Sequence, residues 1–432
     1  MLLLGVLLTA ACFAAVSVES ATAASIARPA DAWLARATPS TATIRWTSVS
    51  GAASYELRRG GKRVATVRAP RTSYIARRLS PATFHQYQVV AKRGGARSIA
   101  SDVIPAVTTA ATGCTHYVAS NGSDSASGSS AAPWRSIQRL VDAWQPGWVG
   151  CLTGSFAEDV SIRRGGSGRA KVTLRSTPGT RASLRGRVWI ANGANNVVIA
   201  ELNLDGRAIS DNERRTLPSP TINGNGAMLL RNDISNARTR VCAVLGSIHG
   251  YGSTSATTLA YNRIHDCGQA GSNTNHGIYV ESGRNVRIVH NVIARNASRG
   301  IQLYPDAQRS LIVGNLIEGN GSGVIFSGAE GYSSSGNRVV RNVIANSTSR
   351  NNIEHYWEAP SAPGTRNVAV RNCLGGARQG NLALPVSGYA ARANLGGVLR
   401  YRNAAGGDWR PAAGSGCRRL LRSSMLPLAP LR

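Results

Sequence analysis

The stretch NVRIVHNVIARNASRGIQLYPDAQRSLIVGNLIEGNGSGVIFSG, residues 285–328, repeats a short unit in which an apolar strand ends at an asparagine. The motif Asn-x-Ile or Asn-x-Leu returns along the chain at intervals of 30, 29, 24, 27 and 30 residues. An internal period of this size predicts a solenoid. Because the units are short and β-rich, with no helix between them, they favour a β-helix over a helical repeat. The motif asparagines are Asn232, Asn262, Asn291, Asn315, Asn342 and Asn372.

These asparagines are predicted to be structural. Each coil has to turn a corner after its strand, and asparagine tolerates the left-handed backbone that such corners often need. Stacked coils lie ~4.8 Å apart, so equivalent asparagines can hydrogen-bond to one another along the stack. We therefore expect a ladder of side-chain amides at one corner of the β-helix.

The segment before the repeats adds a strand, a polar loop and one helix. YVASNGSDSASG occupies residues 117–128, and PWRSIQRLVDA at 133–143 belongs to an amphipathic helix expected over 134–145. Together with HGIYV, GIQLYPD and GVIFSG, these segments resemble the pectate-lyase-like superfamily. More narrowly, they are similar to secreted bacterial right-handed parallel β-helix repeat proteins.

This resemblance covers residues 114–417 and implies an all-β fold, a right-handed parallel β-helix (a solenoid) of about nine or ten coils. It also implies that the 134–145 helix caps one end of the core. YRNAAGGDWRPAAGSGC, residues 401–417, resembles the closing coil at the other end. Caps of this kind protect the open edges of a strand stack. Residues 418–432 are then a C-terminal tail.

Residues 28–111 form a separate pattern of short alternating strands divided by turn residues, which predicts a small β-sandwich. RWTSVSGAASYELRRGGKRV (45–64) and LSPATFHQYQVVA (79–91) resemble a fibronectin type III domain, with Trp46 as the buried core tryptophan. His85 stands where that family normally has its corner tyrosine. The resemblance implies a spacer or a wall- or carbohydrate-binding module.

The first 24 residues read as a secretory signal peptide, because an apolar run from Leu2 to Val18 precedes an A-x-A pattern at 21–23. A lipid anchor on Cys12 is the weaker alternative. No later segment has the ~20 apolar residues that a membrane-spanning helix needs. We expect a secreted, extracellular and monomeric protein without a membrane span.

Six cysteines remain after the signal peptide, and an even number in an exported chain indicates disulfides. Six cysteines allow fifteen pairings. Pairing of sequence neighbours gives the expected bridges Cys114–Cys151, Cys242–Cys267 and Cys373–Cys417.

The formal net charge is +29, and nearly all of the positive charge is arginine. Such a surface favours an acidic polysaccharide, a teichoic acid or another cell-wall glycan as partner. Nucleic acid is not expected, because aromatic residues are not interleaved with the arginines and the protein is exported.

Three consecutive coils carry the candidate site. Alternation along a strand sends Ile278 and Val280, Ile301 and Leu303, and Val324 and Phe326 inward. Tyr279 should then stand over Gln302, and Glu281 over Tyr304, on the outer surface. Ile325 and Ser327 should follow outside, and Glu354 and Tyr356 could extend the row, which would turn His355 inward.

Side chains of these types fit a polysaccharide lyase acting by β-elimination on an acidic glycan. Such a reaction needs a group that neutralises the uronate carboxylate, a base and an acid. The expected catalytic residues are His276, Tyr279 and Tyr304, and the expected substrate-binding residues are Glu281, Gln302, Asp306, Arg309 and Glu354. A non-catalytic glycan-binding β-helix stays open as the alternative. A glycoside hydrolase or uronate epimerase is the third reading, since paired carboxylates such as Glu281 with Glu354 or Asp306 could serve.

No cofactor is assigned with certainty from the sequence. Ca²⁺ could bind Glu201, Asp205, Asp211 and Glu213 in ELNLDGRAISDNER, although a solvated loop explains these residues more simply. His265-Asp266 lies beside a predicted disulfide and is interpreted first as a hydrogen bond at a corner and second as a catalytic pair.

Overall fold

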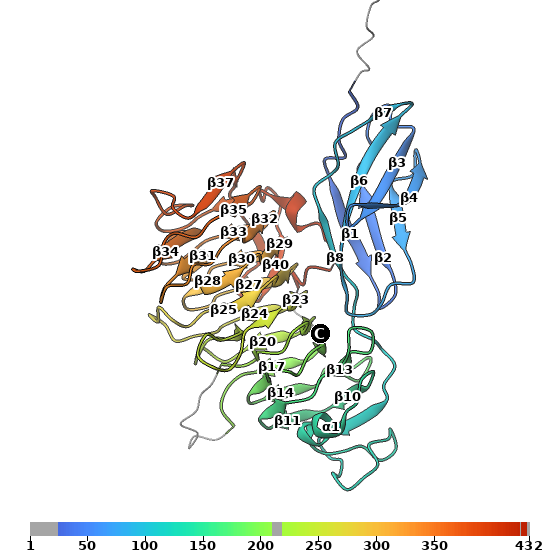
Figure 1. Ribbon diagram of the computed structural model, residues 1–432, viewed down its shortest axis with the longest axis vertical. Helices are drawn as coiled ribbons and strands as arrows, with labels where there is room; N and C mark the ends of the chain where they lie inside the picture. The colour runs from blue at the N-terminus through green and yellow to red at the C-terminus, as the bar shows by residue number, and fades with distance from the viewer. Residues whose placement is uncertain (1–24, 210–217, 424, 430–432) are drawn as a thin grey trace, which may run out of the picture.

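The computed structural model describes residues 25–209, 218–423 and 425–429, so the predicted signal peptide lies outside the described residues. Two β-structures follow each other along the chain (Figure 1). The first is an antiparallel sandwich and the second is a parallel β-helix, and the sandwich lies beside the β-helix, not on its end. No described helix is long and apolar enough to cross a membrane.

The β-helix consists of three parallel sheets, which we call sheets 1, 2 and 3, and the chain visits them in that order in each coil. Sheet 1 contains β9 (His116–Ala119), β10 (Val149–Thr153), β13 (Val172–Ser176), β16 (Val197–Ala200), β19 (Met228–Leu230), β23 (Thr258–Ala260), β26 (Arg287–Val289), β29 (Leu311–Val313), β32 (Arg338–Val340), β35 (Asn367–Val370) and β37 (Tyr389–Arg392). Sheet 2 contains β11 (Ser155–Ala157), β14 (Ser183–Arg185), β17 (Asn203–Asp205), β20 (Asp233–Ser235), β24 (Arg263–His265), β27 (Val292–Ala294), β30 (Leu316–Glu318), β33 (Val343–Ala345), β36 (Cys373–Gly375) and β38 (Leu395–Gly396). Sheet 3 contains β12 (Val160–Ile162), β15 (Val188–Ile190), β18 (Thr221–Ile222), β21 (Ala243–Leu245), β25 (Ile278–Arg284), β28 (Arg299–Gln308), β31 (Ser322–Gly328) and β34 (Ile353–Trp357), with β22 (Thr254–Ser255) beside β25.

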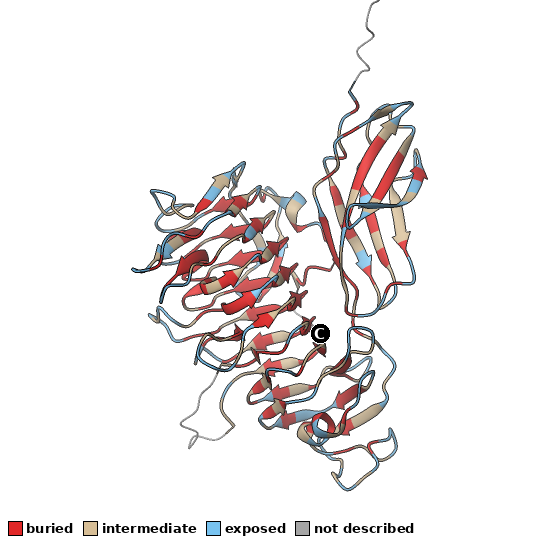
Figure 2. Cartoon of the chain, viewed as in Figure 1, coloured by how far each residue is buried: buried red, intermediate tan, exposed pale blue. Residues whose placement is uncertain are grey.

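Aliphatic side chains fill the space between the three sheets. Figure 2 shows that the strands of the β-helix consist largely of buried residues. In sheet 3, Ile278, Ile301, Val324 and Ile353 stand in register on successive coils, and all four are fully buried. The predicted inward set is therefore confirmed. This continuous apolar column supplies most of the driving force for stacking, because burial of each such side chain contributes about 1.5–3 kcal/mol.

The asparagine ladder is confirmed and lies at the corner between sheets 1 and 2. Each motif asparagine donates its Nδ2 to the Oδ1 of the asparagine on the next coil, over distances of 2.9–3.1 Å. The same Oδ1 also accepts the backbone N–H of the asparagine before it, as between Asn291 and Asn315 at 2.8 Å. The ladder continues to Asn394, one coil beyond the motif.

The prediction that asparagine itself adopts the left-handed backbone at this corner is wrong. The left-handed residue is the one before each asparagine, such as Arg231, Tyr261 and Arg341, whose φ angles are 57°, 61° and 56°. The asparagine is instead selected by its amide, which satisfies a buried backbone N–H and a buried C=O of the preceding coil and also bonds to the asparagine of the next coil. Shorter ladders of the same kind join Asn296 to Asn320 and Asn337 to Asn367.

One end of the core is covered by α1 (Ile137–Ala143), within the expected 134–145 segment. Ser136 caps its N-terminus by accepting the N–H of Arg139, as a serine at this position commonly does. Ile137, Leu140 and Val141 are buried against the first coils, and Trp144 joins the same cluster. The apolar face predicted for the helix is thus the one that covers the core.

The sandwich pairs a three-stranded and a five-stranded antiparallel sheet. Trp46 lies in its core, where it contacts Tyr55 edge-on at 5.2 Å between ring centroids. The outer side of the sandwich contacts sheet 1. The hydroxyl of Tyr261, in the corner after β23, donates to the carbonyl of Val107 and accepts the N–H of Val107. The strands are β1 (Ala32–Ala37), β2 (Ala42–Trp46) and β5 (Ser73–Ala76), then β3 (Ser54–Arg59), β4 (Lys62–Arg68), β6 (Phe84–Arg93), β7 (Ala96–Arg97) and β8 (Ile104–Val107).

The three predicted disulfides are all present: Cys114–Cys151, Cys242–Cys267 and Cys373–Cys417. The first ties the start of the β-helix to β10, and the second links neighbouring coils. The third fixes the C-terminal segment to β36. Each one closes a loop within one part of the chain, as expected from the sequence.

The prediction of a closing coil at residues 401–417 is wrong. These residues form an antiparallel hairpin, β39 (Tyr401–Asn403) and β40 (Asp408–Pro411), which does not join the stack. The hairpin runs back over the outer face of sheet 2 and lies beside the middle coils (Figure 1). The physical reason is the apolar outer face of sheet 2, where small and aliphatic side chains bury Trp409 to 1% exposure. A short 3₁₀ turn, η1 (Arg418–Leu421), follows it.

Polar contacts fix this hairpin at two places. Arg263 and Arg295 cover the ring of Trp409 at 4.7 and 5.0 Å from its centroid. Glu318 accepts hydrogen bonds from the Tyr401 hydroxyl and the Asn346 amide, each at 2.7 Å. Burial raises the pKa of Glu318 to about 7, in spite of these donors.

We predict that Asn315→Ala in the middle of the ladder lowers the free energy of unfolding by about 3 kcal/mol, because buried groups on both neighbouring coils lose their partners. Asn394→Ala is the matched control. It lies at the half-buried end of the ladder and donates to no further asparagine, so water can replace its bonds and its loss should cost clearly less. Denaturant unfolding measures both. Equal losses for the two variants would contradict a cooperative role for the ladder.

We also predict that Glu318→Gln removes part of the pH dependence of stability. Since the pKa of Glu318 is raised in the folded state, its stabilising effect is complete below about pH 4.5 and is lost as the pH rises through about 7. The glutamine variant should therefore gain stability relative to wild type between about pH 5 and pH 8. Tyr401→Phe keeps the carboxyl but removes a donor that lowers its pKa, so the free energy of unfolding of this variant should depend on pH at least as steeply as that of wild type in denaturant unfolding. If the free energy of unfolding of Glu318→Gln depends on pH as steeply as that of wild type, Glu318 is not the source of this pH dependence.

Candidate functional site

The three predicted catalytic residues lie next to one another: Tyr279 and Tyr304 are on the outer face of sheet 3, and the buried ring of His276 contacts Tyr279 edge-on, at 5.8 Å between ring centroids. Tyr279 on β25 stands beside Gln302 on β28, as predicted. The rings of Tyr279 and Tyr304 lie 6.3 Å apart at their centroids with an interplanar angle of 32°. Both rings are half-buried, and the side-chain Oε1 of Gln302 is buried without a hydrogen-bond partner among the described residues. The face is therefore a small aromatic platform of two tyrosines.

Glu281 does not stand over Tyr304. The register between β25 and β28 shifts after Val280, so that Tyr304 and Pro305 together oppose Glu281. Proline has no N–H to give to the ladder, which makes this position suitable for a bulge. The carboxylate of Glu281 is buried and accepts from the Ser247 hydroxyl and the Ile248 N–H, both at 3.0 Å.

His276 was expected on the surface, and the structure shows it buried, with 2% exposure. Its Nδ1 accepts the N–H of Arg299 at 3.4 Å, and the Arg299 side chain closes over it by donating to Asn273. Burial, and then the positive charge of Arg299, lower the pKa of His276 well below its usual value, against a hydrogen bond with Gln302. The imidazole is neutral and enclosed, so it cannot reach a polymer lying on this face.

Glu354 continues the row in the predicted register, opposite Ile325, but it is only 5% exposed. Its carboxylate faces the Arg299 guanidinium at 3.7 Å. Ile325 and Ser327, expected outside, are buried as well. Tyr356 is 52% exposed, whereas the Nε2–H of His355 donates to the Pro385 carbonyl at 2.8 Å, so the tyrosine alone extends the aromatic surface.

Acidic side chains surround this platform, although the protein as a whole is strongly basic. Burial, and then the nearby charge of Glu281, raise the pKa of Tyr279. Burial, and then Glu358 and Glu330, raise the pKa of Tyr304. Both phenols are consequently protonated and able to donate hydrogen bonds at ordinary pH. Glu330 and Glu358 were missed from sequence, although each follows the strand of a site coil directly, in GAEGY and YWEAP.

Asp306 and Arg309 occupy different places. Asp306 remains near the platform, where it accepts from Gln308 at 2.8 Å and faces the Ser282 hydroxyl at 3.4 Å. Arg309 follows the end of β28, and its left-handed backbone, with φ 53°, turns the chain into sheet 1. The predicted role of Arg309 in this site is therefore wrong, because its side chain faces the space between sheet 1 and the sandwich.

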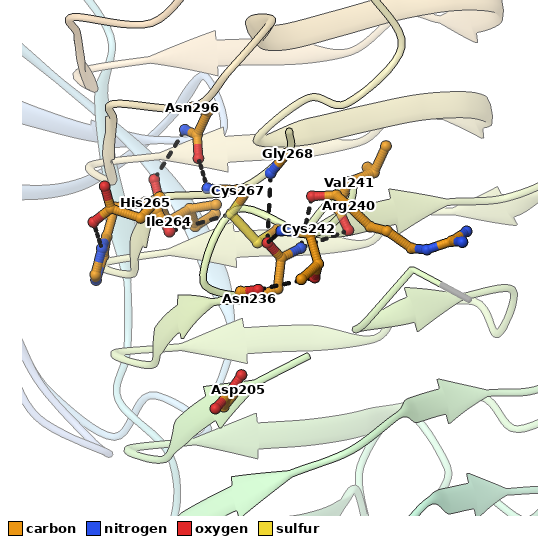
Figure 3. Close-up of a disulfide and its surroundings, with 12 residues drawn as sticks. Asp205, Asn236, Arg240, Val241, Cys242, Ile264, His265, Cys267, Gly268 and Asn296 are labelled. Carbon is orange, nitrogen blue, oxygen red and sulfur yellow. Dashed lines mark hydrogen bonds and ion pairs between the residues drawn. A yellow bond between two sulfur atoms is a disulfide. The ribbon is translucent and has the colours of Figure 1, made fainter. Parts of the chain in front are cut away.

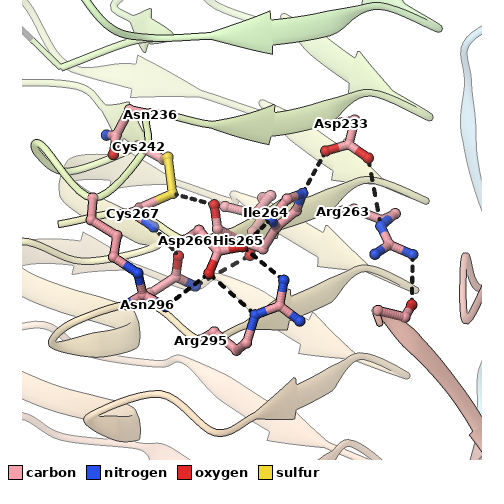
Figure 4. A network of polar contacts seen from close by, with 12 residues as sticks. Asp233, Asn236, Cys242, Arg263, Ile264, His265, Asp266, Cys267, Arg295 and Asn296 are labelled. Carbon is pink, nitrogen blue, oxygen red and sulfur yellow. Dashed lines mark hydrogen bonds and ion pairs between the residues drawn. A yellow bond between two sulfur atoms is a disulfide. The ribbon is translucent and has the colours of Figure 1, made fainter. Parts of the chain in front are cut away.

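A second polar cluster surrounds His265 on the outer face of sheet 2 (Figures 3 and 4). The imidazole lies between two carboxylates, with Nε2 at 2.6 Å from Asp233 and Nδ1 at 2.7 Å from Asp266. Burial disfavours its charged form, but these two hydrogen bonds outweigh burial and raise the pKa of His265. Arg295 binds Asp266 at 2.7 Å and also covers Trp409. The predicted hydrogen bond at this corner is confirmed, and the cluster fastens the C-terminal hairpin.

The carboxylates considered for Ca²⁺ are engaged with arginines. Glu201 pairs with Arg175 and Arg231, and Asp205 accepts from Arg207 at 2.8 Å. Asp211 and Glu213 lie outside the described residues. Within residues 25–209, 218–423 and 425–429, no three His, Cys, Asp or Glu side chains gather as metal ligands would.

Comparison with known families gives a partial match. Residues 251–381, less than half of the chain, match the family described as "Periplasmic copper-binding protein (NosD)". The matched segment contains the coils of the aromatic platform and the His265 cluster. No curated protein matches the chain.

Several solved structures resemble parts of the chain at low identity. XylC in complex with xylose is 12% identical, with a TM-score of 0.50, over 66% of this chain and 70% of that one. Pectate lyase Pel9A is 14% identical, with a TM-score of 0.49, over 71% of this chain and 91% of that one. A fibronectin type III domain of human fibronectin type III domain containing protein 3 is 20% identical, with a TM-score of 0.20, over 22% of this chain and 97% of that one. The XylC match shows a shared fold.

Proposed function

We propose that this protein is an exported glycan-binding β-helix protein, whose binding face is the outer surface of sheet 3. One observation supports this most directly. Tyr279 and Tyr304 present tilted, half-buried rings on neighbouring coils. A tyrosine ring offers a flat apolar surface for a sugar face, and its hydroxyl offers a hydrogen bond to a sugar hydroxyl. Three disulfides fit an extracellular or periplasmic location.

The charge of this face indicates a neutral glycan, in contrast to the acidic polysaccharide expected from composition. Glu281, Asp306, Glu330 and Glu358 lie on or near the platform, and a uronate would be repelled by them. The nearby arginine, Arg299, is buried and faces Glu354. A neutral sugar avoids this repulsion and can donate its hydroxyls to the half-buried carboxylate of Asp306 and the exposed carboxylates of Glu330 and Glu358.

A polysaccharide lyase is the second candidate. In its favour, the hydroxyls of Tyr279 and Tyr304 and the amide of Gln302 converge on one face. Two features weigh against it: His276 is enclosed, and the raised pKa of Tyr279 makes a phenolate base costly at ordinary pH. Binding without cleavage is therefore the better supported function.

We do not propose copper binding, because the residues in the matched segment do not fit it. Cys267 and Cys373 are in disulfides, and His265 is held between two carboxylates. His276 and His290 are buried, and His290 faces the Gly314 carbonyl at 3.2 Å. Among the described residues these imidazoles do not gather as ligands of one ion.

We predict that Tyr304→Ala weakens glycan binding by about tenfold or more, because a central aromatic contact is removed. Isothermal titration calorimetry with neutral and acidic oligosaccharides, a xylose oligomer among them, measures the affinity. The matched control is Tyr117→Ala, a half-buried tyrosine on β9 at the first coil, which should bind as wild type does. If wild type binds no neutral glycan, or if both variants lose affinity equally, the proposal fails.

A second prediction separates binding from cleavage. Tyr304→Phe keeps the ring and removes the hydroxyl, so it should keep affinity within about threefold. If Tyr304 acts as a lyase acid or base, the same change should lower the release of unsaturated products about a hundredfold. We expect no such products from wild type on any polyuronate. Turnover that depends on the hydroxyl would establish the lyase instead.

A further inference from the structure

An arginine-lined cleft lies on another side of the β-helix, between the sandwich and the outer face of sheet 1. Its volume is about 1380 Å³. Nine arginines line it, and among its described lining residues Asp102 is the single carboxylate. The six exposed arginines that the β-helix contributes carry the argument below: Arg284, Arg309, Arg338, Arg366, Arg371 and Arg392.

The arginines follow the stacking of the coils. Arg309 and Arg366 hold equivalent left-handed turn positions before sheet 1, two coils apart, with Gly336 at that position on the coil between them. After sheet 1, Arg341 and Arg371 hold equivalent left-handed positions on successive coils. The N–H of Arg371 donates to the carbonyl of Arg392 on the coil beyond. Because coils are ~4.8 Å apart, the cleft has two rows of positive charge parallel to the long axis of the β-helix.

Most of this charge is not neutralised within the protein. The carboxylate of Asp102 is shared by Arg28, Arg341 and Arg371. Among the described residues, no carboxylate lies within ion-pairing distance of Arg284, Arg309, Arg338, Arg366 or Arg392. Like charges gathered in a concave site with low-dielectric walls create a strong local positive potential.

The cleft is also held in a fixed shape. Tyr261 joins sheet 1 to the sandwich through both backbone groups of Val107, at 3.0 and 2.8 Å. Asp102 on the sandwich holds Arg341 of the β-helix at 2.7 Å, and Arg287 covers the Phe84 ring at 4.9 Å. A site that is already ordered loses little conformational freedom when a ligand enters.

We propose that this cleft binds a linear anionic polysaccharide, which lies along the two rows with its charged groups on the arginines. Regularly repeated charges on an extended chain match a regularly repeated set of guanidinium groups, and guanidinium binds carboxylate and phosphate alike. Nucleic acid fits less well, because the Phe84 ring is already covered by Arg287 and leaves no platform for stacking bases. This site is separate from the face of sheet 3, and it does not depend on the function proposed for that face.

The test compares two variants with equal loss of charge. In the cleft variant, Arg309, Arg338 and Arg366 are each changed to Gln. In the control, the exposed residues Arg63, Arg169 and Arg418, which lie outside the cleft, are changed to Gln. Fluorescence anisotropy measures binding of labelled polygalacturonate, a poly(glycerol phosphate) chain, and double-stranded DNA of similar charge, at several salt concentrations. The first two probes distinguish carboxylate from phosphate polymers.

We expect the cleft variant to bind the anionic glycan about tenfold more weakly, and its affinity to depend less steeply on salt, while the control stays near wild type. Equal weakening in both variants would show that net charge alone attracts the polymer, and would overturn the proposal. Absence of binding by wild type would overturn it too. If DNA binds wild type as tightly as the anionic glycan does, and the cleft variant loses the same fraction of its affinity for DNA, the cleft does not select a polysaccharide.

Discussion

The buried asparagine ladder is the constraint on which the rest of this structure depends. Each corner between sheets 1 and 2 leaves backbone N–H and C=O groups inside the stack, where water cannot satisfy them. Asn291, Asn315 and Asn342 each satisfy an N–H and a C=O of the preceding coil while hydrogen-bonding to one another. One coil can therefore not slip against the next without breaking several buried bonds. This fixed register aligns the aliphatic column of sheet 3 and also the rows of side chains on the outer faces.

The features that repeat with the coil could be predicted from the sequence. The period of Asn-x-Ile located the ladder, alternation gave the inward residues of β25, β28 and β31, and neighbouring cysteines gave the disulfides. Features that interrupt the repeat could not be predicted in the same way. Pro305 shifts the register and separates Glu281 from Tyr304, and Arg299 folds over His276 from the next coil. The hairpin at 401–411 was missed because its glycine-rich sequence resembles a coil, while its place is set by Trp409 and two distant arginines.

The net charge of +29 conceals an uneven distribution of charge over the molecule. The face of sheet 3 carries carboxylates around Tyr279 and Tyr304, whereas the outer side of sheet 1 carries arginines with the single carboxylate of Asp102 among the described lining residues. The sequence contains a signal for this second arrangement. Arginine directly precedes or follows the sheet 1 strands in GRNVRI, QRSLIV, NRVVRN and TRNVAVRN. A search of the sequence for charged residues that recur with the period of the coil, in addition to apolar residues, would have found this row of arginines.

This separation follows from the geometry of a coil. A strand of a β-helix turns alternate side chains into a shared core, so only its other residues and the corners are free to vary in chemistry. Each sheet presents its own set of outward positions, and the rigid stack keeps the sets on different sides of one long body. Sheet 2 uses its outward positions to hold the C-terminal hairpin through Glu318, Arg263 and Arg295. Sheet 1 uses part of its surface to hold the sandwich and leaves the arginine cleft beside it, while sheet 3 keeps its aromatic platform uncovered. A protein built in this way can hold a neutral and an anionic polymer at the same time, because its core keeps the two surfaces apart.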